Sequence, residues 1–390
     1  MENRIKQANQ SIIDVLNLEI EKGQLPGAAI SIIYKGQNVI NNCLGYSDLE
    51  QKKQVTQDSI FRIYSMSKPI AAVAAMIQVE RGLIDIYAPI QIYLPEFKNM
   101  QVCKDGKLEK AKREILVKDL LDMTSGIVYP DIDEAGLHME ELFTQLQTRL
   151  NQGERITTLE ICNKIANIPL AFHPGERWRY GLGVDVMGAI IEVTSGMRLS
   201  EFYAKEIFNP LGMQDTGFYV EQEKQERLSV LYKYEDHLLK PDEKRHLCLT
   251  KCLSAPSFES AGAGIVSTLR DYNQFAQMLV NYGTYRDVKL LSRKSVELFT
   301  QNHLTRKQLA AVNFETSIGY GYGNFMRVYQ DLTLAGALGT VGEFGWDGWS
   351  GPYVTINPFE NLTIVMMLQR GGYTNASLIR KIRNIAYSIL

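Results

Sequence analysis

The stretch Ile63-Tyr64-Ser65-Met66-Ser67-Lys68-Pro69-Ile70 stands directly before a run of small and apolar residues, 71–79. Pro69 suits the first turn of a helix, because its fixed φ angle fits there and its missing N–H needs no partner. The alanines that follow have high helix propensity. The stretch therefore predicts a helix whose first turn carries a serine and a lysine.

Ser65 and Lys68 form an S-x-x-K pair, and no other serine of the chain has a lysine three residues later. Residues at this spacing share a helix face, with Cβ atoms about 5–6 Å apart. A serine becomes a good nucleophile when a nearby base takes its proton, and a desolvated lysine has a lowered pKa. The pair predicts a catalytic serine; the structural alternative is a serine N-cap beside a solvated lysine.

The bulk composition is that of a globular protein. The chain has 390 residues, 45% hydrophobic and 22% charged, with a net charge of −2, enough for one large domain or two fused ones. We find no basic block that would indicate nucleic acid and no apolar run of the ~20 residues that span a membrane. The N-terminal residues lack the pattern of a signal peptide, so we expect a cytoplasmic protein.

Cysteine and histidine patterns give no indication of a metal or cofactor. The five cysteines are spread along the chain without a C-x-x-C pair, and we interpret them as buried reduced thiols. The five histidines lie far apart in the sequence, and none has a triad-like context. We interpret them as surface or core residues; they are His138, His173, His237, His246 and His303.

Both ends of the chain contain strand patterns beside helix patterns. Alternating and apolar runs predict antiparallel hairpins at each end, with 61–63 extending the first sheet. The predicted strands are 28–34, 38–44, 353–356 and 362–368, and the predicted terminal helices are 5–22 and 375–390. One antiparallel sheet built from both termini and flanked by helices, an α+β fold, explains this pattern.

The middle of the chain has mainly helical periodicity. The predicted helices are 115–122, 131–165, 184–194, 200–209 and 270–281. Residues 221–250 are charged and weakly periodic, and they form either the rim of a pocket or a surface insertion. We expect a sheet domain of residues 1–85 plus 265–390, a mainly helical domain of residues 86–264, and a site in the cleft between them.

Six short stretches, in this order, resemble the serine β-lactamase and penicillin-binding-protein superfamily. They are 25–29 (LPGAA), 61–70 (FRIYSMSKPI), 120–126 (LLDMTSG), 174–180 (PGERWRY), 209–213 (NPLGM) and 261–268 (AGAGIVST). The chain looks closest to the class C β-lactamase-like branch and its family VIII carboxylesterases. The resemblance covers about residues 24–370 and implies a β-lactamase/transpeptidase-like fold.

The resemblance implies roles for individual residues. Ser65 would be acylated, and Lys68 and Tyr180 would share the handling of its proton, with either as the general base. The third motif of the family corresponds to 345–349 (GWDGW), where Gly348 would let substrate lie along a strand. The backbone N–H groups of Ser65 and Trp349 would form the oxyanion hole.

Departures from the β-lactamase pattern indicate the substrate class. Trp346 stands where those enzymes carry a lysine for an anionic carboxylate, Leu182 stands where they often carry asparagine, and Met123 occupies a position often held by histidine. These changes favour a neutral ester in an aromatic pocket. The expected aromatic walls are Tyr129, Trp178, Phe344, Trp346 and Trp349.

The sequence thus predicts a serine hydrolase that works through an acyl-enzyme, a carboxylesterase on small esters. The alternatives are a β-lactamase, a D-amino-acid peptidase or transpeptidase, and an idle penicillin-binding-like module that only binds. The expected partner is a small-molecule ester or amide, with no nucleic acid, membrane, metal or cofactor, and the sequence assigns no oligomeric state.

Overall fold

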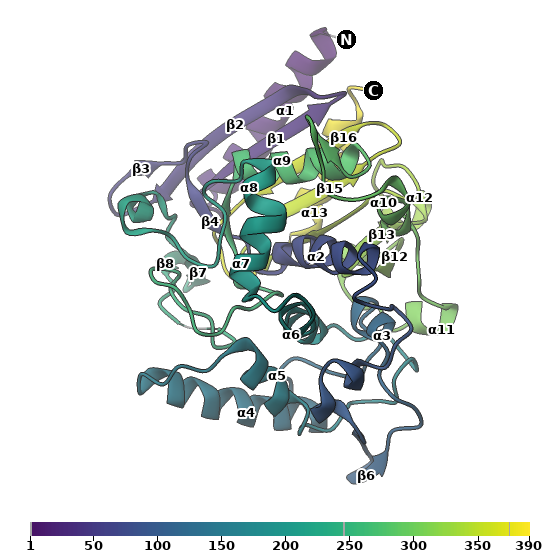
Figure 1. Ribbon diagram of the computed structural model, residues 1–390. Coiled ribbons are helices and arrows are strands. Elements are labelled where there is room, and N and C mark those ends of the chain that lie inside the picture. The colour runs from purple at the N-terminus through teal and green to yellow at the C-terminus, as the bar shows by residue number, and fades with distance from the viewer. Residues whose placement is uncertain (1, 245, 374) are drawn as a thin grey trace.

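An eight-stranded antiparallel sheet joins the two ends of the chain (Figure 1). The computed structural model describes residues 2–244, 246–373 and 375–390. The strand order is β12-β13-β14-β15-β16-β1-β2-β3, and Ala29 of β1 pairs with Met367 of β16. The strands are β1 (Gly27–Tyr34), β2 (Gln37–Asp48), β3 (Lys53–Gln54), β12 (Tyr320–Gly323), β13 (Met326–Tyr329), β14 (Phe344–Asp347), β15 (Tyr353–Asn357) and β16 (Leu362–Met367).

Helices cover both faces of this sheet. The terminal helices α1 (Glu2–Glu21) and α13 (Ala376–Tyr387) pack together and share one apolar cluster with β1, β2 and β16. On the other face, α9 (Leu269–Val280) packs on β1, β15 and β16. Behind it, α2 (Lys68–Glu80) is buried along nearly its whole length and contacts α6 (Gly183–Ser195). The predicted α+β fold is confirmed.

The remaining helices and hairpins surround this core. The helices are α3 (Val117–Leu121), α4 (Glu134–Asn151), α5 (Thr158–Ile165), α7 (Leu199–Tyr203), α8 (Asn209–Leu211), α10 (Arg293–Phe299), α11 (Arg306–Leu309) and α12 (Leu332–Ala335). The short strand pairs are β4 (Ile60–Arg62) with β9 (Val266–Thr268), β5 (Gln101–Lys104) with β6 (Lys107–Lys110), β7 (Tyr232–Glu235) with β8 (Leu238–Pro241), and β10 (Thr284–Tyr285) with β11 (Val288–Lys289).

Two sequence-based expectations need correction. Residues 61–63 do not extend the main sheet, because β4 pairs with β9 and places Phe61 opposite Ser267. Residues 131–165 form two helices and not one. The chain turns at Gly153, which has a positive φ of 88° that favours glycine, and Thr157 then caps α5 by accepting a hydrogen bond from the N–H of Glu160.

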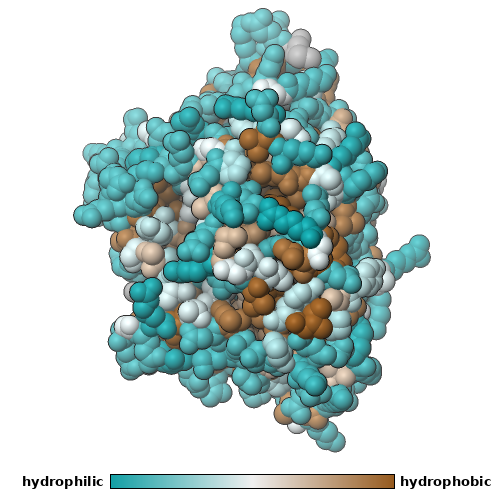
Figure 2. Space-filling model, in the orientation of Figure 1, coloured by the Kyte–Doolittle hydropathy of each residue, from teal (hydrophilic) through white to brown (hydrophobic). Residues whose placement is uncertain are grey.

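The division into domains stays a prediction. All eight strands of the large sheet lie within residues 1–85 and 265–390, as that division requires. No helix among the described residues combines the length and the apolar character needed to cross a membrane. Figure 2 shows that hydrophilic residues cover most of the face seen in Figure 1, with apolar patches near its middle.

Candidate active site

Ser65 lies where the chain leaves β4 and enters α2. A single 3₁₀ turn, η1 (Tyr64–Ser67), makes this connection, and Tyr64 in it has a φ of +44°. A bulky residue in this left-handed region is strained, and such strain persists only where the surrounding structure holds it. The turn leaves Ser65 partly exposed on the wall of a cavity, while the residues that follow are buried.

Lys68 is buried behind Ser65, on the same side of the chain, as their spacing of three residues predicts. Its Nζ atom lies 3.0 Å from the Ser65 hydroxyl, 2.9 Å from the carbonyl oxygen of Gly262 and 3.3 Å from the hydroxyl of Tyr129. The side chain has no exposed surface. Among the described residues, no carboxylate lies within 4.0 Å of this amine, so its neighbours are neutral oxygens.

Burial lowers the pKa of Lys68 to about 7, against the opposing effect of the Asp185 and Asp347 carboxylates. Asp185 on α6 is itself buried and accepts hydrogen bonds from the Ser260 hydroxyl (2.6 Å) and the Gly262 N–H (3.2 Å). A substantial fraction of Lys68 is therefore an unprotonated amine near neutral pH, which is the form that can accept a proton from Ser65.

Tyr180 precedes α6, and its ring lies against the Lys68 amine. The Lys68 Nζ atom is 4.7 Å from the centroid of its ring, and its hydroxyl accepts a hydrogen bond of 3.0 Å from Nε1 of Trp346. Burial raises the pKa of Tyr180, although hydrogen bonds with Ser65 and Trp346 act in the opposite direction. The phenol is therefore protonated near neutral pH.

The third motif brings the end of β14 against the 3₁₀ turn that carries Ser65. A Cβ atom on Gly348 would come within 2.3 Å of the carbonyl oxygen of Ile63, so only glycine allows this approach. Trp346, Gly348 and Trp349 all line the cavity at Ser65. The assignment of the Ser65 and Trp349 N–H groups to an oxyanion hole stays a prediction.

Comparison with known proteins identifies the family of this chain. The Beta-lactamase family model matches residues 2–387. The chain belongs to the Beta-lactamase family. The resemblance inferred from the six stretches is therefore confirmed.

Individual relatives of this family member cover most of its length. The "Protein Rv1367c" of Mycobacterium tuberculosis is 31% identical over 363 residues, 90% of this chain and 87% of the relative. The "Esterase EstB" of Burkholderia gladioli is 26% identical over 368 residues, covering 90% and 88%. The solved structure of "EstCE1, a hydrolase with promiscuous acyltransferase activity" superposes with a TM-score of 0.82 at 24% identity, covering 98% and 99%.

The cavity of this Beta-lactamase family member has a volume of about 460 Å³ and a mainly apolar wall. Most of the site residues predicted from the sequence line it: Ser65, Tyr129, Tyr180, Trp346, Gly348 and Trp349. Leu182 is buried immediately before α6 and is not part of this lining. Trp178 and Phe344 are also buried, so two of the five expected aromatic walls belong to the core behind the cavity.

Two further segments complete the cavity. Neither contains one of the motifs identified in the sequence. His246, Leu247 and Leu249 come from the charged segment 221–250, which therefore forms part of the rim. Phe314 and Thr316 come from a separate segment before β12. The His246 ring lies 4.4 Å from the Trp349 ring, and its Nε2 is 3.3 Å from the Asp242 carboxylate. The interpretation of His246 as merely a surface or core residue is thus incomplete, and no local sequence signal marks it.

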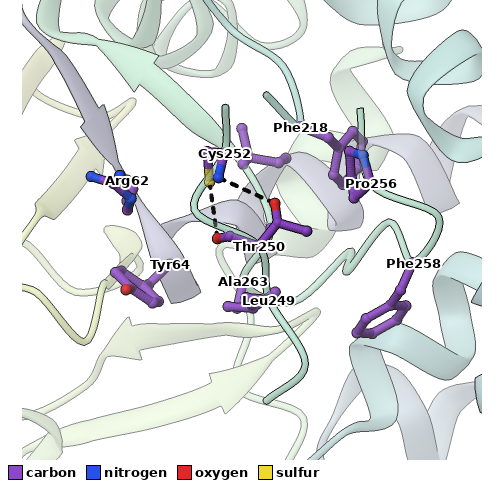
Figure 3. Close-up of a pocket in the computed structure, with 11 residues that line it drawn as sticks. Arg62, Tyr64, Phe218, Leu249, Thr250, Cys252, Pro256, Phe258 and Ala263 are labelled. Carbon is purple, nitrogen blue, oxygen red and sulfur yellow. Dashed lines mark hydrogen bonds between the residues drawn. The ribbon is translucent and has the colours of Figure 1, made fainter. Parts of the chain in front are cut away.

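A second, smaller cavity, whose lining residues are drawn in Figure 3, adjoins the first. The two cavities share Tyr64, Leu249 and Ala263 in their walls, and the smaller one extends to the turn in which the Cys252 N–H donates to the Thr250 hydroxyl. Its volume is about 20 Å³, close to that of a single water. The larger cavity is therefore the one that can hold a substrate.

Proposed function

We propose that this protein is a serine hydrolase that cleaves small neutral esters through an acyl-enzyme on Ser65. The observation that carries the proposal is the 3.0 Å contact between the Ser65 hydroxyl and the buried Lys68 amine. A lysine whose pKa is lowered to about 7 can serve as a general base at neutral pH, whereas Tyr180, with its raised pKa, is poorly suited to that role in the free enzyme.

The proposed reaction has two halves. Lys68 takes the Ser65 proton while Oγ attacks the ester carbonyl carbon, and the carbonyl oxygen becomes an oxyanion. The carbon–oxygen bond to the alcohol then breaks, and the alcohol leaves with the proton that Lys68 had accepted. A water molecule repeats these steps on the acyl-enzyme, so the carboxylic acid is released and the Ser65 hydroxyl is restored.

Tyr180 would act as a proton carrier and not as the initial base. Its hydroxyl is fixed by the Trp346 indole N–H and its ring covers the Lys68 amine. The proton that Lys68 accepted can therefore reach the leaving alcohol through Tyr180, which gives its own hydroxyl proton to the alcohol and takes the Lys68 proton in its place. The predicted oxyanion hole would stabilise the charge that develops in both halves.

The cavity wall supports a neutral substrate. None of the described residues that line it is a lysine or arginine, and its aromatic side chains include Tyr129, Phe314 and Trp349. The one carboxylate among the described lining residues is that of Asp347, which lies 3.1 Å from the guanidinium of the buried Arg327. An anionic carboxylate such as that of a β-lactam meets no lysine or arginine on the described part of this wall, whereas an alkyl or aryl ester is stabilised by apolar contact.

Covalent labelling tests the nucleophile. We expect a serine-reactive phosphonate to add one adduct to the parent protein, by intact mass, and none to Ser65→Ala. The matched control is Ser67→Ala, since Ser67 is fully buried and its hydroxyl has no hydrogen-bond partner among the described residues. Labelling that persists in Ser65→Ala would overturn the assignment of Ser65.

A stopped-flow comparison tests the substrate class. We expect a burst and turnover with a short-chain p-nitrophenyl ester, and slow or absent hydrolysis of a chromogenic cephalosporin. Rapid cephalosporin hydrolysis would instead show a β-lactamase. If neither substrate forms an adduct, the result would favour a peptide substrate or an idle binding module.

A further inference from the structure

A group of three side chains outside the cleft has the composition of a metal site. Cys103 of β5 lies beside Glu134 and His138 of α4, and one ligand atom from each lies within 4.8 Å of the other two. The group is at the end of the molecule where Figure 1 shows α4 and the hairpin of β6. The active-site chemistry proposed above uses none of these residues.

The three residues converge through local structure and a tertiary contact. Glu134 and His138 are four residues apart, so α4 presents both on one face. The hairpin of β5 and β6 brings Cys103 to that face, and the N–H of Cys103 donates 2.9 Å to the carbonyl oxygen of Leu170, which fixes the strand. The donors are thus held together without an ion.

The donor set is one that zinc prefers. Thiolate, imidazole and carboxylate are its usual ligands, at bond lengths of about 2.0–2.3 Å, so ligand atoms in a tetrahedral site lie roughly 3.3–3.8 Å apart. The observed spacing would need only a small contraction. Calcium and magnesium prefer sites made of oxygen alone, so the thiol and imidazole favour a softer transition metal.

We propose that Cys103, Glu134 and His138 bind one zinc-type divalent cation, with water in the fourth position. Cys103 is 7% exposed, whereas Glu134 and His138 lie on the surface, so the ion would be held from the inner side and open to solvent on the outer side. Three protein ligands and one open position are typical of an accessible zinc site.

Neighbouring charges leave these ligands available. The carboxylates of Asp131 and Asp133 are bound to the Arg179 guanidinium, and Asp133 also caps α4 by accepting a hydrogen bond of 2.8 Å from the N–H of Gly136. Burial, together with the Glu134 carboxylate, raises the pKa of the Cys103 thiol to about 11, so without an ion it stays protonated. Binding would release that proton to solvent.

The site would join the hairpin to the start of α4. Arg179 precedes Tyr180, and Pro130 lines the active-site cavity, so the segment that leads into α4 runs along the cleft. A bound ion would tie this segment to the β5–β6 hairpin. It would stabilise the folded protein in proportion to its occupancy, independently of esterase chemistry.

Metal titration of the full-length protein tests the proposal. After dialysis against a chelator, we expect calorimetry to show one Zn²⁺ per chain and Co²⁺ to give a thiolate-to-cobalt charge-transfer band. His138→Gln should weaken Zn²⁺ binding by at least about tenfold, and Cys103→Ser should also remove the cobalt band. Cys43→Ser is the matched control, because Cys43 is a free thiol outside the cluster.

Several outcomes would overturn the site. They are a parent protein that binds no Zn²⁺, a cobalt band that persists in Cys103→Ser, and equal affinity in parent and His138→Gln. Because Cys103 is buried, Cys103→Ser could fail to fold; His138 is exposed on a helix, so His138→Gln keeps the test decisive. Thermal unfolding should show stabilisation by Zn²⁺ in the parent and in Cys43→Ser, and little in His138→Gln.

Discussion

Lys68 and Arg383 are two fully buried basic side chains with different surroundings. Lys68, 0% exposed, contacts neutral oxygens in the cleft. Arg383, 1% exposed, lies on α13 under the sheet, forms an ion pair with the buried Glu343 and contacts the Thr355 hydroxyl at 3.0 Å. Burial opposes both charges, but around Arg383 the effects of Tyr353 and Glu343 outweigh it and raise the pKa.

The difference shows how one protein uses burial in two ways. Where a carboxylate accompanies the cation, the charge persists and the pair connects α13 to the residues before β14. Where no carboxylate forms an ion pair with the amine, as at Lys68, the same low-polarity environment favours the neutral form. The first arrangement holds the fold together, and the second prepares a base.

The largest expected effect is on turnover in Lys68→Met. Removal of the base should lower kcat/KM for a p-nitrophenyl ester by about 10²–10⁴-fold, the range for general acid–base catalysis. Urea unfolding should show a smaller loss of stability than in Arg383→Met, since Lys68→Met removes hydrogen bonds to neutral oxygens but leaves no buried carboxylate without its ion-pair partner. A rate within a few-fold of the parent would show that Lys68 is not the base.

Arg383→Met should have the opposite effect. Because it leaves the Glu343 carboxylate buried without its partner, the free energy of unfolding should fall by about 3–5 kcal/mol, measured by urea denaturation. The kcat of the folded fraction should stay unchanged. The double variant Arg383→Met, Glu343→Leu should recover most of the loss, and no recovery would contradict the ion-pair explanation.

Tyr180→Phe tests the proposed role of Tyr180 as proton carrier separately from the role of Lys68 as base. The substitution removes the hydroxyl that accepts from Trp346 but keeps the ring over Lys68, and acylation should slow by about 100-fold. Single-turnover kinetics with detection of the adduct by mass measure this step. An unchanged rate would leave Lys68 to handle every proton alone.

The smallest effect is a shift in pH dependence. Since the base must be unprotonated, kcat/KM should rise with pH and level off above a midpoint of about 7, the lowered pKa of Lys68. The Asp185 carboxylate raises this pKa, so Asp185→Asn should move the midpoint to lower pH. A shift to higher pH would contradict the electrostatic role of Asp185.

Local patterns predicted the elements that carry strong periodicity. The terminal helices, the hairpins of β1–β2 and β15–β16, and α6 lie close to their expected ranges, because burial of one helix face or strand face leaves a clear pattern. The strands β12 and β13 were missed. The segment of β12, Tyr-Gly-Tyr-Gly, has low strand propensity at its glycines, and only pairing with its neighbours makes it a strand.

The candidate site also contains residues that the sequence predicted and residues that only the tertiary structure brings to it. Spacing and motif order indicated Ser65, Lys68, Tyr180 and Trp346, and the structure brings all four together. His246 and Phe314 were missed because their loops carry no motif, and only the folded chain places them on the cavity wall. Contacts between distant loops leave no periodic trace in a sequence.

The sequence alone determined which serine and lysine lie three residues apart at the start of a helix. It also determined the order of the family motifs on either side of them. Tertiary structure decided the chemistry of that lysine. The oxygen of Gly262, the carboxylate of Asp185 and the aromatic ring of Tyr180 reach Lys68 from segments more than 100 residues away. A pKa depends on the solvation and charge around a group, and those are properties of the packed molecule and not of its spacing along the chain.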